Sequence, residues 1–568
     1  MWEHNYQPIG DSIGLSAIVA VIPIVVLFVM LGALRKPAWM SALTALASAF
    51  VIALLVYGMP AQLAVTSTLF GAAFGMFPIA WIVFCSIMLY RLAVDTGKFE
   101  IIKSSIGGLT DDRRLQALFI AFSFGAFIEG AAGFGAPVAV SGAMLAGLGF
   151  NPFYAAGICL LANTAPVAFG SIGTPVITLA NVTGLPPMAL SAMVGRLCAM
   201  LSVLIPAYLM IVMVGRRKAL QVWPAIVACG VSFAGMQYYV SNHLGPELTD
   251  IMSSLTCIGV MVLVLKLWKP KEIMRLEGDQ PVSITKKKQG AGPVFMAWLP
   301  YMLLVVAVLT LGEPSIKAKV NTWTDGFMPD SVRAEPVAHP TPPARLNRIM
   351  VPGLHNMITQ VPPVVPKPTP YAALFELNWL TASGTACLLA TIAAALCLGV
   401  GPARFAGIYI ATFKQLKWAI VTIASMLGLA YLMNYSGMTS TLGLSLAATG
   451  KVFPFFSAFV GWLGVFLTGS DTSANALFGN LQVVTANALS LNPVLTASVN
   501  SAAGVMGKMI SIQSIAVSVA ATGMTSKDES RLFRFTIKHS ILLMVVMGLM
   551  SMAFAYIFPH LVPVVPPK

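Results

Sequence analysis

The sequence predicts an all-α polytopic membrane protein with about twelve transmembrane helices and two re-entrant hairpins in an inverted repeat. Three observations carry this prediction. Hydrophobic residues make up 57% of the 568-residue chain, its mean hydropathy is +0.83, and only 10% of its residues are charged. Apolar runs long enough to cross a bilayer recur along the chain. Two polar breaks, each with one carboxylate, interrupt apolar runs at corresponding positions of the two halves.

The basic balance of the chain is explained by membrane topology. The net charge is +14, and polytopic proteins concentrate Lys and Arg in their cytoplasmic loops. Positive-inside topology is therefore favoured over nucleic-acid binding. The first apolar run, Ile13–Leu34, is long enough to span and follows a polar segment, so no cleavable signal peptide is expected. The seven cysteines lie in apolar segments without metal-type spacing, which is typical of small core residues.

The first hairpin is predicted over Leu118–Leu148, around the glycine-rich stretch GAFIEGAAGFGAP at Gly125–Pro137. Neither flanking apolar run reaches the ~20 residues that a crossing needs. Non-helical backbone at membrane depth survives only inside protein or beside a water-filled cavity, and a carboxylate there is costly unless it is protonated or paired. The stretch therefore predicts a re-entrant tip at which Glu129 faces a polar site.

The second hairpin, Phe453–Leu489, repeats this arrangement. GVFLTG at Gly464–Gly469 echoes GAFIEG in the first half, and the following SDTSAN is a polar break that contains Asp471. Asn151-Pro152 then matches Asn492-Pro493, and Ser171-Ile172 matches Ser511-Ile512. Discontinuous segments at corresponding positions of two halves indicate the binding site of a secondary transporter.

A charged, proline-rich segment, 313–377, separates a first membrane half, 1–312, from a second, 378–568. Its composition favours an extended or partly disordered loop. Two spans are expected to be broken: Phe153–Ala180, by the polar stretch Asn163–Pro175, and Val494–Ala520. The remaining predicted spans are Ile13–Leu34, Ala38–Tyr57, Leu63–Tyr90 (kinked around Gly71, Gly75 and Pro78), Met188–Val214, Val222–Val240, Leu248–Leu267, Val294–Leu311, Leu380–Gly399, Trp418–Tyr435 and Ile541–Ile557, with Phe405–Leu416 along the membrane interface.

Positive charge orients this topology. Most of the 34 Lys and Arg fall in loops on one side, which is then cytoplasmic. Both termini and the segment 313–377 are expected outside. The first hairpin would open to the cytoplasm and the second to the exterior, as an inverted repeat requires.

Glu129 and Asp471 are the candidate proton-coupling residues. A buried carboxyl is costly when charged, so Glu129 could bind and release a proton; alternatively, backbone N–H groups of the glycine turn pin it. Asp471 could bind a proton, a cation or a hydroxyl-bearing substrate. It could also cap the following half-helix, whose N-terminal end attracts anions.

Lys508 lies near the middle of a predicted span, within GVMGKMISIQS. A lysine at that depth is an ion-pair partner or the counter-charge of an anionic substrate. Asp471 or Glu129 is its natural internal partner. Arg196 is a weaker candidate, because it is close enough to the end of a span to snorkel.

Further polar and glycine positions suit a small oxygenated molecule, because glycine and proline neighbours free backbone groups for a ligand. Isolated Ser and Thr in membrane helices more often bond their own i−4 carbonyl, but clustering at matched repeat positions favours binding. The candidate substrate-binding residues are Gly130, Gly133, Gly135, Asn163, Thr164, Ser171, Thr174, Ser470, Thr472, Ser473, Asn475, Asn500, Ser501, Lys508, Ser511 and Gln513.

Signals of an enzyme are absent from the sequence. It contains no Walker A motif and no zinc-type His/Glu pair on a helix. The six histidines fall in loops or at span ends, where they offer no intramembrane proton wire. No catalytic residue, metal or cofactor is expected.

Four long motifs resemble the L-lactate permease family: GAFIEGAAGFGAPVAVSGAMLAGLGF, NPFYAAGICLLANTAPVAFGSIGTP, LTGSDTSANALFGNLQ and GVMGKMISIQS. Members of that family are bacterial inner-membrane symporters that take up lactate or glycolate with a proton. Ile512 departs from the family pattern, in which a proline is expected.

This resemblance implies a proton-coupled symporter of L-lactate, and of D-lactate and glycolate, in the bacterial inner membrane. The expected partners are a small monocarboxylate, a proton and the bilayer, with no nucleic acid; a homo-oligomer stays open. The substrate carboxylate would meet half-helix N-termini and Lys508, and Glu129 or Asp471 would carry the proton. A sodium-coupled carboxylate transporter is the first alternative, and a channel or receptor is the second.

Overall fold

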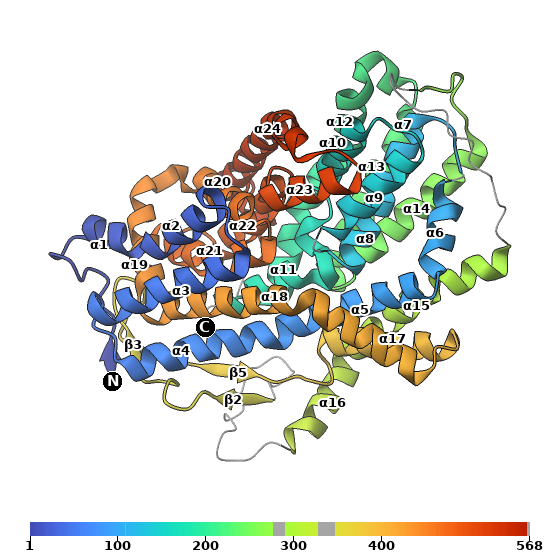
Figure 1. Cartoon of the computed structure of the whole chain (residues 1–568). Coiled ribbons are helices and arrows are strands. Elements are labelled where there is room, and N and C mark those ends of the chain that lie inside the picture. Colours follow the sequence, from blue (N-terminus) through green and yellow to red (C-terminus); the bar gives the residue numbers. More distant parts are fainter. Residues whose placement is uncertain (108, 134, 276–289, 328–346, 565–568) are drawn as a thin grey trace.

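The computed structural model describes residues 1–107, 109–133, 135–275, 290–327 and 347–564. Over these residues the chain forms a bundle of helices, with a few short strands at one end (Figure 1). Among them, ten helices are long and apolar enough to cross a membrane, or twelve if each of two bent helix pairs counts as one span. The predicted all-α class and the number of spans are therefore confirmed.

The chain begins with a strand and a series of apolar helices. The helices α4 and α5 are joined through η2 into a run from Ala61 to Asp95. It bends at Phe77, next to Pro78, as the predicted kink requires. The elements are β1 (Trp2–Glu3), α1 (Ile13–Ala20), α2 (Ile22–Phe28), η1 (Val29–Ala33), α3 (Ala38–Leu55), α4 (Ala61–Phe74), η2 (Gly75–Ala80), α5 (Trp81–Asp95) and α6 (Lys98–Gly107).

The first predicted hairpin is a pair of antiparallel helical arms. One fully buried helix runs from Arg113 to Ala131, and α9, which begins at Ala136, packs back against this helix. The broken span follows, with a bend of 63° between its two parts. The elements are α7 (Arg113–Gln116), η3 (Ala117–Phe124), α8 (Gly125–Ala131), α9 (Ala136–Gly147), α10 (Pro152–Ala162), η4 (Val167–Phe169) and α11 (Gly170–Thr183).

Four long helices close the first half: α12 (Pro187–Leu220), α13 (Trp223–His243), α14 (Thr249–Leu267) and α15 (Ala291–Gly312). Within its described residues the proline-rich segment forms one helix and four short strands joined by turns, so the expectation of an extended or partly disordered loop is wrong for these elements. Residues 328–346 lie outside the described residues. These elements are α16 (Pro314–Asp325), β2 (Arg348–Met350), β3 (Ile358–Gln360), β4 (Thr369–Pro370) and β5 (Leu374–Glu376).

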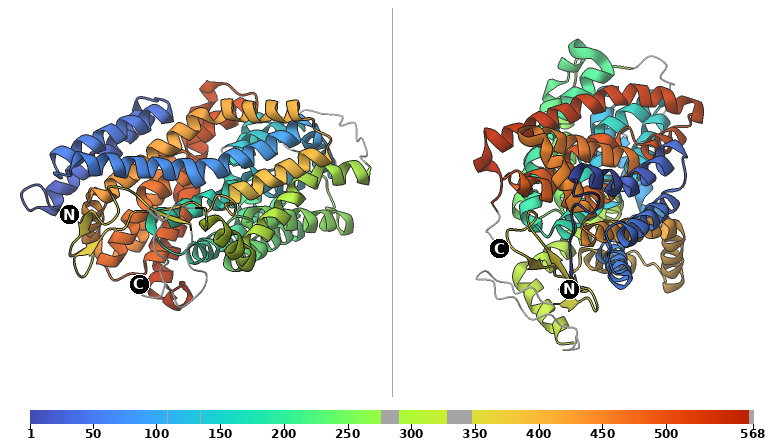
Figure 2. Two further views of the ribbon diagram at one scale, coloured as in Figure 1. Left: turned by 90° about the horizontal axis from the view of Figure 1, so that it is seen from below. Right: turned by 90° about the vertical axis from the view of Figure 1, so that its left-hand side faces the viewer.

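The N-terminal strand β1 pairs in parallel with β3, with Trp2 opposite Ile358. The strand β3 pairs antiparallel with β4, and β2 pairs antiparallel with β5. This sheet fixes the N-terminus beside the proline-rich segment. Figures 1 and 2 also place the labelled N-terminus beside these strands, at one end of the molecule.

The second half repeats the hairpin and the broken span. Helix α18 is continuous over 34 residues, so the separate interfacial segment predicted at Phe405–Leu416 is wrong. The broken pair α22 and α23 is bent by 41°. The elements are α17 (Ser383–Cys397), α18 (Pro402–Tyr435), α19 (Met438–Leu446), η5 (Ala447–Val452), α20 (Phe453–Thr468), α21 (Asp471–Ala488), α22 (Pro493–Lys508), α23 (Ile512–Ala521), η6 (Ser526–Asp528), α24 (Glu529–Tyr556) and η7 (Pro559–Leu561).

The hairpins and broken spans occupy the interior, and other helices surround them. In Figures 1 and 2, α3, α4 and α18 lie side by side along one flank, and α12 and α13 pack together on another. The break of the first half is buried, whereas Ile512 and Gln513 at the break of the second half are exposed. Burial in protein and contact with a cavity are the two conditions under which such backbone is tolerated at membrane depth. The re-entrant character of the hairpins and the inverted repeat stay predictions, because arm lengths alone do not separate a hairpin from a crossing.

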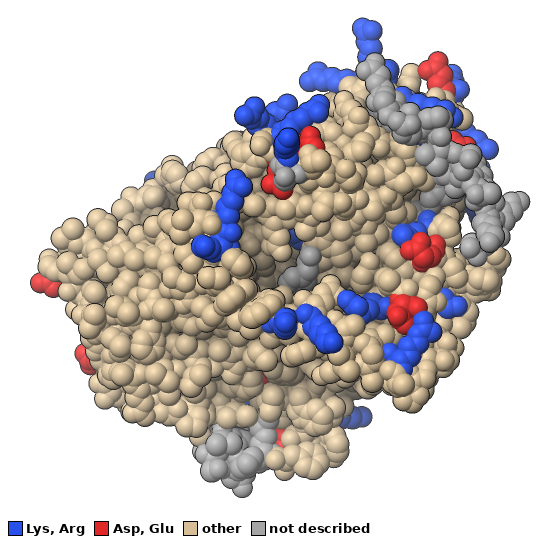
Figure 3. Space-filling view, viewed as in Figure 1, with Lys and Arg blue, Asp and Glu red and all other residues tan. Residues whose placement is uncertain are grey.

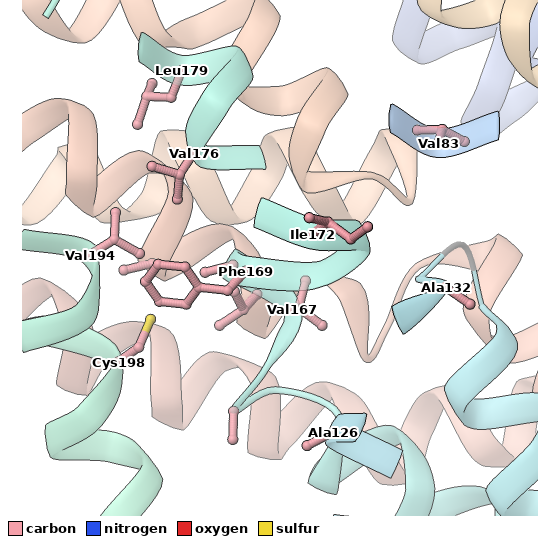
Figure 4. Packing of buried hydrophobic residues seen from close by; sticks show 14 of the residues in the cluster. Val83, Ala126, Ala132, Val167, Phe169, Ile172, Val176, Leu179, Val194 and Cys198 are labelled. Carbon is pink, nitrogen blue, oxygen red and sulfur yellow. The ribbon is translucent and has the colours of Figure 1, made fainter. Parts of the chain in front are cut away.

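Apolar side chains hold the first broken span in the core (Figure 4). The ring of Phe169 points toward Val194 and Cys198 of α12. Ala126 of α8 and Ala132, directly after α8, lie on the other side of the broken span. Small residues on α8 allow the backbones to come close. Six of the seven cysteines are buried free thiols, and Cys397 is exposed.

Candidate functional site

A cavity of about 520 Å³ lies where the two hairpin tips meet the two broken spans. The surface is hollowed at the centre of the face in Figure 3, above the position of α18 in Figure 1. Residues from both halves line the cavity. They include Trp39, Glu129, Gly133, Gly135, Gly170, Ser171, Trp418, Ser470, Asp471, Thr472, Ser473, Lys508, Gln513 and Ser514.

Several helices begin at the cavity. Ser470 caps α21 by accepting a hydrogen bond from the backbone N–H of Ser473 at 3.3 Å. Ser511 caps α23 in the same way, accepting from the N–H of Ser514 at 3.2 Å. The N-cap of α9 is Gly135, which offers no side chain. Helix N-termini carry partial positive charge and unpaired N–H groups, so the cavity wall suits an anion.

One buried ion pair crosses the cavity between the two halves. Lys508 Nζ donates to Glu129 Oε1 at 2.9 Å, and the two side chains are 11% and 3% exposed. The other oxygen, Oε2, has no partner among the described residues. Gly170 makes room for the carboxylate, since a Cβ there would lie 2.5 Å from Oε1. Of the two acids expected as partners of Lys508, the geometry selects Glu129.

Asp471 is held by neutral donors instead. The hydroxyl of Ser501 donates to its Oδ2 at 2.6 Å, and the amide of Asn475 donates to the same oxygen at 3.4 Å. Its Oδ1 has no partner among the described residues. Asn475 also donates to the carbonyl of Pro175 at 3.1 Å, which ties the second hairpin to the first broken span.

This network extends away from the cavity through buried amides. Asn500 donates to Asn475 Oδ1 at 2.9 Å, and Gln482 donates to Asn500 Oδ1 at 3.1 Å. Gln482 also donates to the carbonyl of Ser457 at 3.1 Å. Gln482 was not predicted, because a single amide within a helical pattern carries no signal of its partners.

The tip of the first hairpin is tied to the break in the first broken span. Ser171 Oγ donates to the carbonyl of Ala132 at 2.6 Å, and a Cβ at Gly133 would lie 2.6 Å from that hydroxyl. Ser171, Ile172 and Gly173 have φ values of 46°, 56° and 70°. Left-handed backbone costs an L-residue roughly 1–2 kcal/mol, so surrounding contacts must hold this turn in place.

The tip of the second hairpin makes a comparable contact. Gly469 is left-handed, with φ of 71°, and a Cβ there would lie 2.7 Å from Gln513 Oε1 and 3.5 Å from Ser511 Oγ. The break here is an ordinary helix start, since Ser511 has φ of −63° and ψ of 139°. Both tips therefore press a glycine against a polar side chain of their own broken span.

The remaining predicted residues lie close to the cavity but are engaged in structure. Thr164 donates to the carbonyl of Leu161 at 2.7 Å, and Thr174 donates to that of Ser171 at 2.5 Å. Asn163 lines a small gap beside Lys508, and its Oδ1 has no partner among the described residues. The predicted residues outside the lining of the main cavity are Gly130, Asn163, Thr164, Thr174, Asn475, Asn500, Ser501 and Ser511.

Arg196 lies away from the cavity. Its guanidinium donates to Asn242 Oδ1 at 3.0 Å and to the carbonyl of Leu561. It joins α12 to the end of α13 and to the C-terminal segment, which is a structural role.

Sequence reasoning also missed an aromatic pair. Trp39 and Trp418 stack with ring centroids 4.7 Å apart at the edge of the cavity. Nothing in the sequence joins residues so far apart along the chain. Within the described residues, no group of three or more metal-ligating side chains is present.

A model of the family described as L-lactate permease matches residues 16–558. The chain belongs to the L-lactate permease family. It is 47% identical to the L-lactate permease of Bacillus subtilis (strain 168) over 99% of this chain and 100% of the relative. It is 44% identical to the glycolate permease GlcA of Escherichia coli (strain K12) over 98% of each, and 42% identical to the L-lactate permease of that strain over 99% and 100%.

Among solved structures, the chain is similar to the YdaH transporter of Alcanivorax borkumensis, with a TM-score of 0.43 and 14% identity over 86% of this chain and 87% of that one. Family membership and the apolar helices together make the protein a multi-pass membrane protein.

Proposed function

We propose that the protein takes up L-lactate, and also D-lactate and glycolate, by proton symport across the bacterial inner membrane. The observation that carries this proposal is the Lys508–Glu129 ion pair in a cavity surrounded by helix N-termini. Relatives named as lactate and glycolate permeases support the substrate class. A small 2-hydroxy acid needs a cation for its carboxylate and neutral partners for its hydroxyl, and this cavity offers both.

Charge balance couples the proton to the substrate. The empty ion pair has no net charge. A lactate carboxylate that takes Lys508 leaves Glu129 with an uncompensated buried charge, which costs about 3–5 kcal/mol. A proton on Glu129 removes that cost, so each ligand strengthens the binding of the other. The loaded site then holds one proton, one lactate and Lys508 without a net change of charge.

The substrate hydroxyl is assigned to the second hairpin. Asp471 lines the cavity beside Ser470, Thr472 and Ser473, and its network of neutral donors fixes its orientation. A carboxylate or hydroxyl oxygen at this position can accept a hydrogen bond from the 2-hydroxyl of lactate. Gly133 and Gly135 line the same cavity without side chains, which leaves room for the substrate.

Orientation follows from the distribution of charge. Lys and Arg gather toward the top and right of Figure 3, away from the strands and the labelled N-terminus of Figure 1. By the positive-inside rule that region is cytoplasmic and both termini are outside. The cavity edge at Pro37–Trp39 directly follows Arg35-Lys36, so this conformation opens inward. Alternating access then requires the hairpins to move against the surrounding helices.

Uptake of radiolabelled L-lactate by proteoliposomes tests this function. With an inwardly directed proton gradient and no sodium, we expect uphill accumulation, acidification of the lumen, and competition by D-lactate and glycolate. A matched series at fixed pH with an inward sodium gradient separates the sodium-coupled alternative. A sodium requirement, with no response to the proton gradient, would overturn proton symport.

A further inference from the structure

A second buried acid packs against Gly130, the residue after Glu129. Asp250, in the first turn of α14, is 1% exposed, and neither of its carboxylate oxygens has a hydrogen-bond partner among the described residues. A charged carboxylate without donors in a buried site is very costly. The side chain is therefore stable there only when it holds a proton.

The packing of α14 against α8 brings this acid to the first hairpin. A Cβ at Gly130 would lie 2.7 Å from the Cβ of Asp250, so the absence of a side chain at Gly130 permits the contact. The sequence predicts Gly130 as a substrate-binding residue, but in the structure its missing side chain makes room for Asp250. Glu129, the residue before Gly130 on α8, faces the cavity.

Few other ionisable groups face Asp250. Glu129 and Lys508 act on it electrostatically, and it acts on the buried thiol of Cys198 on α12. The elements η3 and α11, which also pack against α14, carry no charged side chain. On α13, His243 lies at the C-terminal end and is exposed.

Three acids lie between the surface and the cavity. Glu247, in the loop before α14, is partly exposed and accepts a hydrogen bond from Ser383 at 3.3 Å. Asp250 follows it one helical turn later, and Glu129 lines the cavity beyond. The loop also contacts the strained turn, since a Cβ at Gly173 would lie 2.7 Å from the backbone of Pro246. In the proposed orientation this loop is on the exterior side.

We propose that Asp250 is a second proton-binding residue of transport, which passes a proton between the exterior loop and Glu129. This rests on the proton symport proposed above. No hydrogen bond joins the two carboxyls in this conformation. In the inward step a bridging water therefore accepts the proton of Asp250 and gives one of its own to the free oxygen of Glu129. Asp250 then takes a replacement proton from water on the side of Glu247. The ion pair with Lys508 opens as Glu129 becomes neutral.

The test compares Asp250→Asn with Glu129→Gln in proteoliposomes, using two assays. Proton-driven uptake of L-lactate should fall about tenfold in Asp250→Asn, the size of a typical coupling between two ligands. Lactate counterflow, which moves no net proton, should stay within twofold of the parent, with an unchanged KM. Glu129→Gln should lose proton-driven uptake and also change the KM, because Lys508 loses its partner.

The exposed acid Glu100, whose side chain is 70% exposed, provides the control variant Glu100→Gln, which should match the parent in both assays. Asp250→Glu keeps an ionisable group and should restore part of the proton-driven uptake; Asp250→Ser replaces Asp250→Asn if the latter does not fold. Proton-driven uptake equal to the parent, or equal loss of uptake and counterflow in a folded variant, would overturn the proposal. A parent protein that does not respond to the proton gradient would instead refute proton symport itself.

Discussion

The two broken spans perform the same topological task with different chemistry. The first is broken by three consecutive left-handed residues, Ser171–Gly173, and bends by 63°. The second is broken at a regular N-cap, Ser511, and bends by 41°. The first broken span faces Glu129, which is ion-paired across the cavity. The break of the second span comes directly after Lys508, the partner of Glu129 in that ion pair.

The hairpin acids differ in the same sense. Glu129 closes the first arm of its hairpin and meets a full positive charge, whereas Asp471 opens the second arm of its hairpin and meets only hydroxyl and amide donors. A carboxylate such as that of Glu129, whose charge is balanced by a single cationic side chain, can exchange that cation for a proton. A carboxyl held by a network of neutral donors is better suited to orient a ligand. Strain that the surroundings enforce also tends to occur at functional sites, and it lies in the half with Glu129.

The largest expected effect is on the ion pair. Lys508→Ala should abolish proton-driven lactate uptake and destabilise the protein by about 3–5 kcal/mol, because it leaves a buried carboxylate without its partner. The double variant Glu129→Gln with Lys508→Met should recover most of the stability and none of the uptake. Thermal unfolding in detergent measures the first quantity and proteoliposome uptake the second. Equal stability of the single and double variants would show that the pair is not energetically linked.

The next effect separates the two acids. Glu129→Gln should remove uphill accumulation and preserve lactate exchange, while Asp471→Asn should preserve the response to the proton gradient and raise the KM for lactate about tenfold, as expected for one lost polar contact of ~1.4 kcal/mol. Initial rates at several lactate concentrations, with and without a proton gradient, give both quantities. If the two variants behaved alike, the division of roles between the hairpins would be wrong.

The two tip glycines provide a smaller and structural comparison. Alanine at either position must adopt a left-handed backbone, which costs roughly 1–2 kcal/mol. Gly133→Ala should cost more than Gly469→Ala, because the new Cβ meets Ser171, whose hydroxyl is held by Ala132, whereas Gln513 has a flexible side chain that can move. Thermal unfolding of the two variants side by side checks this order. The reverse order would indicate that the second tip is the tighter one.

The smallest effect concerns the matched serines. Ser171→Ala removes one hydrogen bond, to the carbonyl of Ala132, and Ser511→Ala removes the cap of α23, so each should destabilise the protein by about 1 kcal/mol. Only Ser171→Ala should also slow transport, because it releases the first hairpin tip from its broken span. Unfolding temperatures and uptake rates of both variants test this difference. A transport defect confined to Ser511→Ala would reverse the assignment.

Much of the fold and part of the site could be predicted from the sequence. Long apolar runs and interrupted segments are local properties, so the number of spans and both broken spans were predictable. Glu129, Asp471 and Lys508 could be predicted as site residues because a charge at membrane depth is rare. Asp250 could not be predicted, since it lies in the first turn of an apolar span, where an acid also suits the helix N-terminus.

The sequence by itself determined the class of the protein, the positions of the broken backbone and the small set of buried charges, because hydropathy and glycine or proline content act within one segment. Only the tertiary structure decided which acid meets Lys508, that Asn475 ties the second hairpin to the first broken span, and that Gly130 gives room to Asp250. These choices join residues far apart in the sequence, by 300 positions for Asn475 and Pro175 and by 379 for Glu129 and Lys508. They depend on how helices pack in three dimensions, which no local pattern encodes.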